Sequence, residues 1–135
     1  MMAKHYDVIS FGTGSAMTIV SSVIETLPKA HVAIIEKDIV GGICLTRGCI
    51  PSKMLLYPAE LIANVQKTSA FGIDAEVRSV DSKAILERAR KTITEESQII
   101  EKGIMNHPRI DFYKGVGEFI GEYKVKVNNE IIGWA

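Results

Sequence analysis

The sequence lacks the features that mark membrane proteins, nucleic-acid-binding proteins and zinc-stabilised domains. It contains no apolar run close to the roughly 20 residues that span a bilayer. Its 16 basic residues balance its 16 acidic ones, so no net field favours nucleic acid or an anionic membrane. Two cysteines without a second cysteine or histidine pair are too few for structural zinc. We therefore expect no metal, no nucleic acid and no membrane among its partners.

The length and composition are those of one soluble domain. A chain of 135 residues with 47% hydrophobic residues can bury a core of its own. The N-terminus, from Met1 to Asp7, has no long apolar core or cleavage site, which argues against a signal peptide. We expect a cytoplasmic location, where a persistent structural disulfide would be unusual.

The N-terminal section predicts a strand, a glycine turn, a helix and a second strand. Residues 6–11 and residues 31–36 are short apolar runs typical of buried strands. Between them, Gly12-Thr13-Gly14 predicts a turn, Ser15 could cap a helix, and Pro28 follows the end of that helix. This order defines a βαβ unit with parallel strands and a right-handed crossover.

The rest of the chain predicts two helices followed by short strands. Pro51 suits the first turn of a helix to about residue 67, which Pro58 should kink or interrupt. Asp81 or Ser82 can cap an amphipathic helix to about residue 105. Asn128-Asn129 predicts a hairpin turn within the last strands. These strands are expected at residues 110–113, 116–120, 123–127 and 130–134. We therefore predict an α/β fold, a three-layer βαβ domain with a small antiparallel meander.

The glycine turn predicts a dinucleotide-binding site. Gly12 and Gly14 can bring backbone N–H groups to a pyrophosphate at the positive end of the helix. Glu36, at the end of the second strand, is placed to accept hydrogen bonds from ribose hydroxyls and argues against a 2′-phosphate. Met17 stands where a third glycine is usual, so the helix packing must adjust. The turn alone is weak evidence, because many α/β loops need glycine for steric reasons, and it leaves open which dinucleotide binds.

Both cysteines lie in the segment of residues 41–53, Gly-Gly-Ile-Cys-Leu-Thr-Arg-Gly-Cys-Ile-Pro-Ser-Lys. Cys44 and Cys49 can close into a disulfide, which stores two electrons as it opens and closes. A thiolate near a helix N-terminus is stabilised by unsatisfied N–H groups, which lowers a thiol pKa, and Arg47 and Lys53 add positive charge. Two inert buried thiols are the alternative, but they would need neither the glycines before them nor Pro-Ser-Lys after them.

This segment resembles the redox-active segment of the flavin disulfide reductases, the family of dihydrolipoamide dehydrogenase, glutathione reductase and mercuric reductase. The form ending Cys-Ile-Pro-Ser-Lys is most similar to the dihydrolipoamide dehydrogenase branch. The resemblance implies that Cys44 is the interchange thiol, that Cys49 lies beside the flavin, and that Lys53 lies near its reactive edge. Ile43 replaces a threonine whose hydroxyl usually touches the cofactor. The implied FAD-binding residues are Gly12, Gly14, Ser15, Ala16, Glu36, Lys37, Gly41, Gly42, Cys44, Lys53 and Gly117.

The resemblance covers nearly the whole chain but only the first part of a family enzyme. We therefore expect an incomplete FAD-binding domain at residues 1–135, ending before its last strand and without the NAD-binding and dimer-interface domains. The implied parent reaction oxidises a dithiol such as dihydrolipoamide through Cys44 and Cys49, FAD and NAD+, in a homodimer. Mercuric ion or another disulfide are alternative substrates. Two further alternatives are an FAD-binding fragment without turnover and an NAD-binding module with incidental cysteines.

Overall fold

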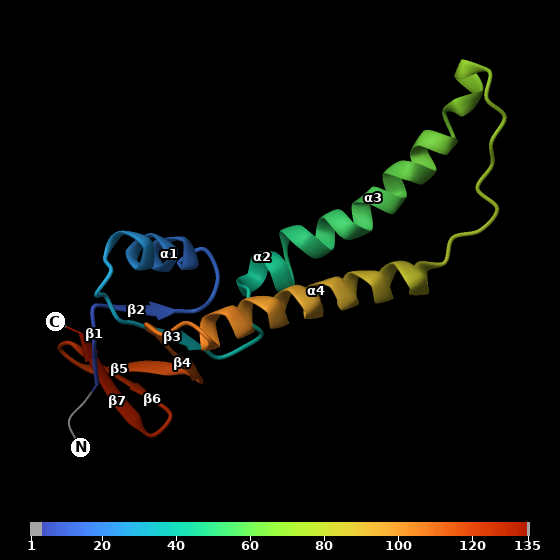
Figure 1. Ribbon diagram of the computed structural model, residues 1–135. Coiled ribbons are helices and arrows are strands. Elements are labelled where there is room, and N and C mark those ends of the chain that lie inside the picture. The colour runs from blue at the N-terminus through green and yellow to red at the C-terminus, as the bar shows by residue number, and fades with distance from the viewer. Residues whose placement is uncertain (1–3, 135) are drawn as a thin grey trace. The chain divides into compact units, whose positions relative to one another are not determined.

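The computed structural model describes residues 4–134 and forms two compact units. One, here called the α/β unit, comprises residues 1–42 and 97–135; the other, the helical unit, comprises residues 43–96. Figure 1 shows the elements of both. Part of the stretch that argues against a signal peptide, residues 1–3, lies outside the described residues, as does Ala135 at the end of the predicted domain.

The first sheet of the α/β unit is parallel. Its order is β2 (Val8–Phe11), β3 (Val32–Glu36) and β4 (Ile110–Lys114), and helix α1 (Met17–Thr26) joins β2 to β3. Every residue of β3 is buried, as expected for a central parallel strand covered on both faces. The predicted α/β fold class and its βαβ unit are confirmed.

The second sheet has the order β1 (Lys4–Tyr6), β7 (Glu130–Trp134), β6 (Lys124–Val127) and β5 (Gly117–Gly121). Strands β5, β6 and β7 form the predicted antiparallel meander. The β6–β7 hairpin turns at Asn128, whose φ of 54° lies in the left-handed region that asparagine tolerates. Strand β1 adds to the far edge of this meander, parallel to β7.

Two strand predictions were wrong in detail. The run at residues 6–11 is not one strand, because the chain changes sheets at Asp7. Its carboxylate accepts the N–H of His31 at 2.8 Å, and its own N–H donates to the carbonyl of His31 at 2.9 Å. The strand predicted at residues 110–113 does not open the meander but pairs with β3 in the parallel sheet.

The α/β unit has three layers because β3 buries both of its faces. Val32 and Ile34 belong to an apolar cluster shared with Val20 of α1 and Ile104 of α4 (Ser82–Met105). The alternate residues of β3 belong to a second cluster on the meander side, which contains Ala33, Ile35, Val125, Val127 and Ile132. The parallel sheet therefore lies between a helical layer and the meander, as predicted.

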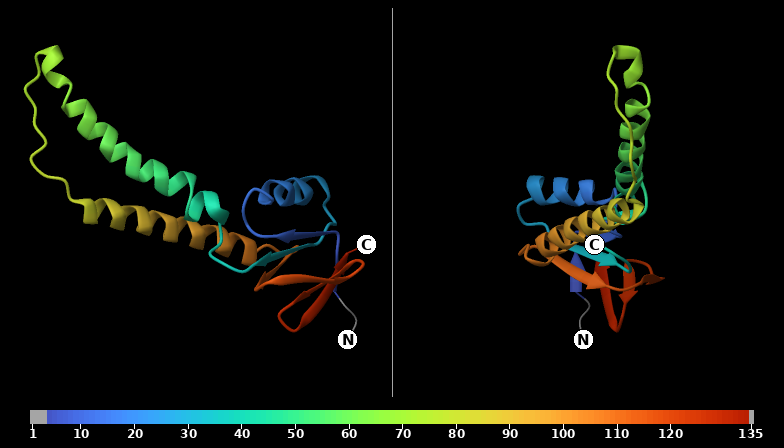
Figure 2. Two further views of the ribbon diagram at one scale, coloured as in Figure 1. Left: turned by 180° about the vertical axis from the view of Figure 1, so that it is seen from behind. Right: turned by 90° about the vertical axis from the view of Figure 1, so that its right-hand side faces the viewer.

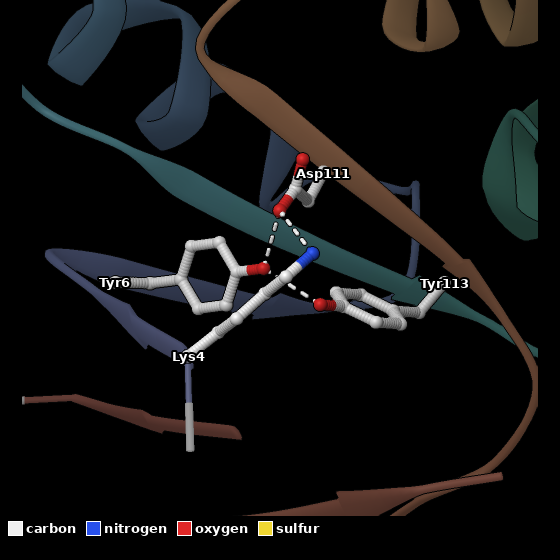
Figure 3. A network of polar contacts seen from close by, with 4 residues as sticks. All are labelled: Lys4, Tyr6, Asp111 and Tyr113. Atoms are coloured by element: carbon white, nitrogen blue, oxygen red, sulfur yellow. Dashed lines mark hydrogen bonds and ion pairs between the residues drawn. The ribbon is translucent and has the colours of Figure 1, made fainter. Parts of the chain in front are cut away.

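A polar network ties β1 to β4 (Figure 3). The Tyr6 hydroxyl donates to Asp111 Oδ2 at 2.5 Å and lies 2.6 Å from the Tyr113 hydroxyl, and Lys4 Nζ lies 3.4 Å from Asp111 Oδ2. The hydrogen bond from Tyr6 is the largest cause of the lowered pKa of Asp111, with Lys4 adding to it against the effect of burial. The network joins the two sheets through side chains of β1 and β4.

The helical unit contains α2 (Gly42–Thr46) from Ile43 onward, α3 (Cys49–Val65), η1 (Thr68–Phe71) and the first part of α4. Figure 2 shows the extended segment that links η1 to α4. Asp81 caps α4 as predicted, since its Oδ1 accepts the N–H of Ala84 at 2.9 Å. Helix α3 continues through Pro58 to Val65, so the alternative of an interruption there was wrong.

Candidate functional site

Two glycine-containing loops of the α/β unit meet in backbone contact. Gly12 leaves β2 with a φ of 90°, and its N–H donates to the carbonyl of Ile35 at 2.7 Å. Gly42 has a φ of 67°, and a Cβ built on it would lie 2.5 Å from the Cα of Gly14. No side chain fits at this crossing, so glycine is required on steric and conformational grounds. The contact leaves backbone, rather than side chains, at the surface of the turn.

Glu36 is the buried anion of this region. Only 7% of it is exposed, yet both carboxylate oxygens have partners. Oε2 accepts the N–H of Thr13 at 2.9 Å and its hydroxyl at 2.7 Å, and Oε1 accepts the N–H of Asp38 at 2.8 Å. Burial alone would raise the pKa of Glu36, but the hydrogen bonds from Thr13 and Asp38, helped by Lys114, lower it. The carboxylate is therefore held in its charged form against the glycine turn.

Thr13 is the residue of this site that reasoning from the sequence missed. It is 4% exposed, and its hydroxyl also accepts the N–H of Gly41 at 2.9 Å. The sole signal in the sequence is a hydroxyl residue inside the glycine turn, upstream of an acid that ends a strand. That signal did not distinguish Thr13 from any other small turn residue.

A cavity of about 300 Å³ opens beside Glu36. It brings together four of the predicted cofactor-binding positions, Gly12, Glu36, Lys37 and Gly117. A Cβ on Gly117 would lie 2.5 Å from the Phe11 ring, so a side chain there would collide with the wall of the cavity. The complete lining is Phe11, Gly12, Ile35, Glu36, Lys37, Gly115, Val116 and Gly117.

The start of α1 differs from the prediction. Ser15 does not cap the helix; Ala16 occupies the N-cap position, without a side-chain hydrogen bond, because the turn is closed by backbone instead. The N–H of Met17 donates to the carbonyl of Gly14 at 3.0 Å. Met17 packs, half-buried, against the helix-side cluster, which accommodates the absence of a third glycine.

The two cysteines are exposed free thiols in the helical unit. Cys44 lies in α2, Cys49 is the first residue of α3, and the two side chains share a hydrogen bond. That hydrogen bond is the largest cause of the raised pKa of Cys44, followed by partial desolvation and the charge of Cys49; Lys53 acts in the opposite direction. The lowered thiol pKa predicted from the sequence is thus not found at Cys44, because the hydrogen bond to Cys49 raises the pKa by more than Lys53 lowers it.

Gly48 allows the thiols to meet. A Cβ on Gly48 would lie 2.9 Å from the carbonyl oxygen of Ile43 and 3.3 Å from the Cα of Cys44. The hydroxyl of Ser52 donates to the carbonyl of Gly48 at 2.7 Å, which fixes the first turn of α3. Lys53 follows Cys49 by four residues, so both project from one face of α3.

Known proteins are similar to this chain in sequence and fold. The chain is 31% identical over 126 residues to dihydrolipoyl dehydrogenase of Chlamydia pneumoniae, a match that covers 93% of this chain and 27% of that protein. It is 31% identical over 128 residues to mercuric reductase of Bacillus cereus, covering 94% of this chain and 20% of that protein. The HOCl-induced flavoprotein disulfide reductase RclA of Escherichia coli superposes with a TM-score of 0.74 at 23% identity, covering 96% of this chain and 26% of that one. No protein-family model matches the chain.

In sequence and fold the chain is a homologue of the flavoprotein disulfide reductases, and its fold corresponds to their FAD-binding domain. Its relatives include dihydrolipoyl dehydrogenases and mercuric reductase, and it spans about a quarter of the length of these curated proteins. The resemblance based on the cysteine segment is confirmed. Among residues 4–134, every helix is too short or too polar to cross a membrane.

Proposed function

We propose that this chain is the FAD-binding, dithiol-bearing part of a disulfide oxidoreductase that acts on a dithiol such as dihydrolipoamide. The observation that carries the proposal is the hydrogen-bonded pair Cys44 and Cys49, with Lys53 on the same helix. Exposure of both thiols supports access by a substrate. The relatives named as dihydrolipoyl dehydrogenases favour this substrate class over mercuric ion.

The proposed chemistry is a thiol–disulfide exchange that balances without a metal. In the oxidised state, Cys44 and Cys49 are joined by a disulfide. One substrate thiolate attacks the sulfur of Cys44 and releases Cys49 as the leaving thiolate. The second substrate thiolate then displaces Cys44, so that the substrate leaves as a disulfide and the chain holds two thiols. Two electrons have moved from the substrate to the protein, and the two protons that the substrate thiols lost on ionisation are balanced by protonation of the released Cys44 and Cys49 thiolates. Lys53 stabilises the negative charge on sulfur during this exchange.

The residues beside Glu36 fit the adenosine end of FAD. Side chains are sterically excluded at Gly42 and Gly117, and the cavity next to the carboxylate has room for a planar ring system. In this proposal Gly12, Gly14, Ser15 and Ala16 present backbone to the pyrophosphate at the start of α1. When bound, FAD supplies an acceptor for the two electrons of the dithiol. NAD+ as the final acceptor, a homodimer and a cytoplasmic location belong to the same proposal.

The test is an absorption titration of the purified chain with FAD, followed by reduction with dithiothreitol. We expect a stoichiometric yellow complex, and a long-wavelength band after two-electron reduction from the Cys49 thiolate in contact with the flavin. The Cys49→Ser variant should bind FAD and lack the band, whereas Cys44→Ser should bind FAD and show it without added reductant. Thr94→Val, which removes an exposed hydroxyl of α4, is the matched control.

Two results separate the parts of the proposal. A chain that takes up no FAD lacks the proposed cofactor function. A yellow chain whose Cys49→Ser variant keeps the band places another donor beside the flavin and overturns the assignment of Cys49.

A further inference from the structure

The hydroxyl of Thr13 stands at the centre of a hydrogen-bond chain that links two loops of the α/β unit. It donates to Glu36 Oε2 at 2.7 Å and accepts the N–H of Gly41 at 2.9 Å. A single oxygen therefore connects the acid at the end of β3 with the loop that leads to Gly42. Because Thr13 is 4% exposed, water does not readily replace either partner.

The direction of these bonds is determined by the chemistry of the partners. An ionised carboxylate only accepts, so the Thr13 hydroxyl must donate to Glu36. The oxygen of that hydroxyl is then free to accept, and the N–H of Gly41 donates to it. The backbone N–H of Thr13 donates to the same carboxylate oxygen at 2.9 Å, so two donors of one residue hold Oε2. Polarisation along such a chain strengthens each bond when the carboxylate is charged.

We infer that Thr13 is a positioning residue that couples the charge and orientation of Glu36 to the Gly41–Gly42 loop. This inference deepens the proposed function and rests on it where FAD is concerned. The two groups it couples contribute to different parts of the site: Glu36 lines the cavity, and Gly42 crosses the backbone of Gly14. A ligand hydroxyl that engages Glu36 would thereby also stabilise the loop arrangement at the glycine crossing.

The first experiment uses the wild-type chain alone, without a ligand. The pH is lowered while the Glu36 side-chain carboxyl carbon and the Gly41 amide are followed by NMR. We expect the Gly41 amide to shift with the same midpoint as Glu36, because protonation of the carboxylate weakens the whole chain of bonds. Three charged groups lie near Glu36: Lys114 on β4, and Lys37 and Asp38, which directly follow Glu36 in the chain. Asp38 also carries a carboxyl group near Glu36 in the chain, so its own carboxyl resonance is followed in the same spectra.

The second experiment compares three variants. Thr13→Val has the same shape but no hydroxyl, Thr13→Ser restores the hydroxyl, and Thr18→Val removes a nearby exposed hydroxyl that donates to the carbonyl of Ser15. In Thr13→Val we expect the Gly41 amide to stop following Glu36 and to exchange with solvent about tenfold faster or more. Affinity for FAD should fall by a similar factor. Thr13→Ser and Thr18→Val should stay close to the wild type in all three measurements.

The pH dependence of FAD affinity distinguishes a positioning role of Thr13 from a merely structural one, because a structural role would leave this pH dependence unchanged. Removal of a donor to the carboxylate raises the pKa of Glu36, so the protonated form, which is a weaker acceptor for a ligand hydroxyl, forms at a higher pH. FAD affinity of Thr13→Val should therefore begin to fall at a higher pH during acidification than in the wild type, and Thr13→Ser should restore the profile.

The outcomes separate this inference from the proposed function. If the wild-type Gly41 amide does not shift as Glu36 titrates, the coupling is overturned, even if Thr13→Val fails to fold. The coupling is also overturned if Thr13→Val and Thr18→Val behave alike. A chain that binds no FAD but shows the coupled titration, lost in Thr13→Val and kept in Thr13→Ser, supports the role of Thr13 and refutes the proposed function alone.

Discussion

At the glycine crossing, close contact between backbones, rather than side-chain chemistry, determines which amino acid each position can hold. In Gly42→Ala the added Cβ would lie 2.5 Å from the Cα of Gly14, and the φ of 67° is unfavourable for alanine. We expect a loss of about 2 to 4 kcal/mol in the free energy of unfolding, from strained backbone and overpacking together. Urea denaturation measures this loss. Gly121→Ala, where a Cβ meets nothing within 4 Å, is the matched control, and an equal effect at both positions would contradict the steric argument.

The residues of the site were not equally predictable from sequence. Gly12, Gly14 and Glu36 follow from a motif whose spacing reflects strand, turn and helix, and the cavity brings Gly12 and Glu36 together with Gly117. The role of Thr13 depends on where Gly41 returns in space, which no local pattern encodes. The pKa direction of Cys44 likewise depends on its hydrogen bond with another sulfur, so reasoning from helix N-termini gave the wrong sign.

Among the elements, the short connection between α2 and α3 controls how closely the two thiols approach. Gly48→Ala would bring a Cβ to 2.9 Å from the carbonyl oxygen of Ile43 and would force the two helices apart. We expect disulfide formation between Cys44 and Cys49 in a glutathione redox buffer to become about tenfold or more less favourable, because the effective concentration of one thiol at the other falls. Quantification of free thiols at equilibrium measures the change.

The control for this prediction is Gly103→Ala in α4, where an added Cβ meets nothing within 4 Å. Its disulfide equilibrium should equal that of the wild type. If Gly48→Ala keeps the wild-type equilibrium as well, the close approach at Gly48 does not determine how the thiols pair.

The sequence predicted helices and strands correctly where the local signals agree. The predictions failed where pairing with a distant strand determines the structure. The cap at Asp81 and the turn at Asn128 are local, and both are present. The break between β1 and β2 depends on Asp7 bonding to His31, a residue far along the chain. Tertiary contacts also determine which sheet β4 joins, because the sequence of β4 suits either a parallel or an antiparallel neighbour.

For the molecule as a whole, two lowered carboxyl pKa values predict how stability depends on pH. Asp111, bonded to Tyr6 and Lys4, and Glu36, bonded to Thr13, both favour the ionised form in the folded state. A carboxyl whose pKa is lower in the folded than in the unfolded state stabilises the fold above its unfolded pKa, near 4. That contribution is lost as the pH falls through the folded pKa. The free energy of unfolding should therefore decrease on acidification below about pH 4.

Asp111→Asn tests the share of this effect that comes from the network between the two sheets (Figure 3). At neutral pH we expect the free energy of unfolding to fall by about 1 kcal/mol. This is a small value for a hydrogen bond to a charged group, because the Asp111 side chain is 50% exposed. As the pH falls below about 4 toward the lowered folded pKa of Asp111, the difference between the variant and the wild type should shrink, since protonated Asp111 no longer differs in charge from asparagine. Urea titrations at pH 7 and pH 3 measure both values, with Asp74→Asn in the exposed segment before α4 as the control. A constant difference between Asp111→Asn and the wild type at the two pH values would show that the network joins the sheets by shape rather than by the charge of Asp111.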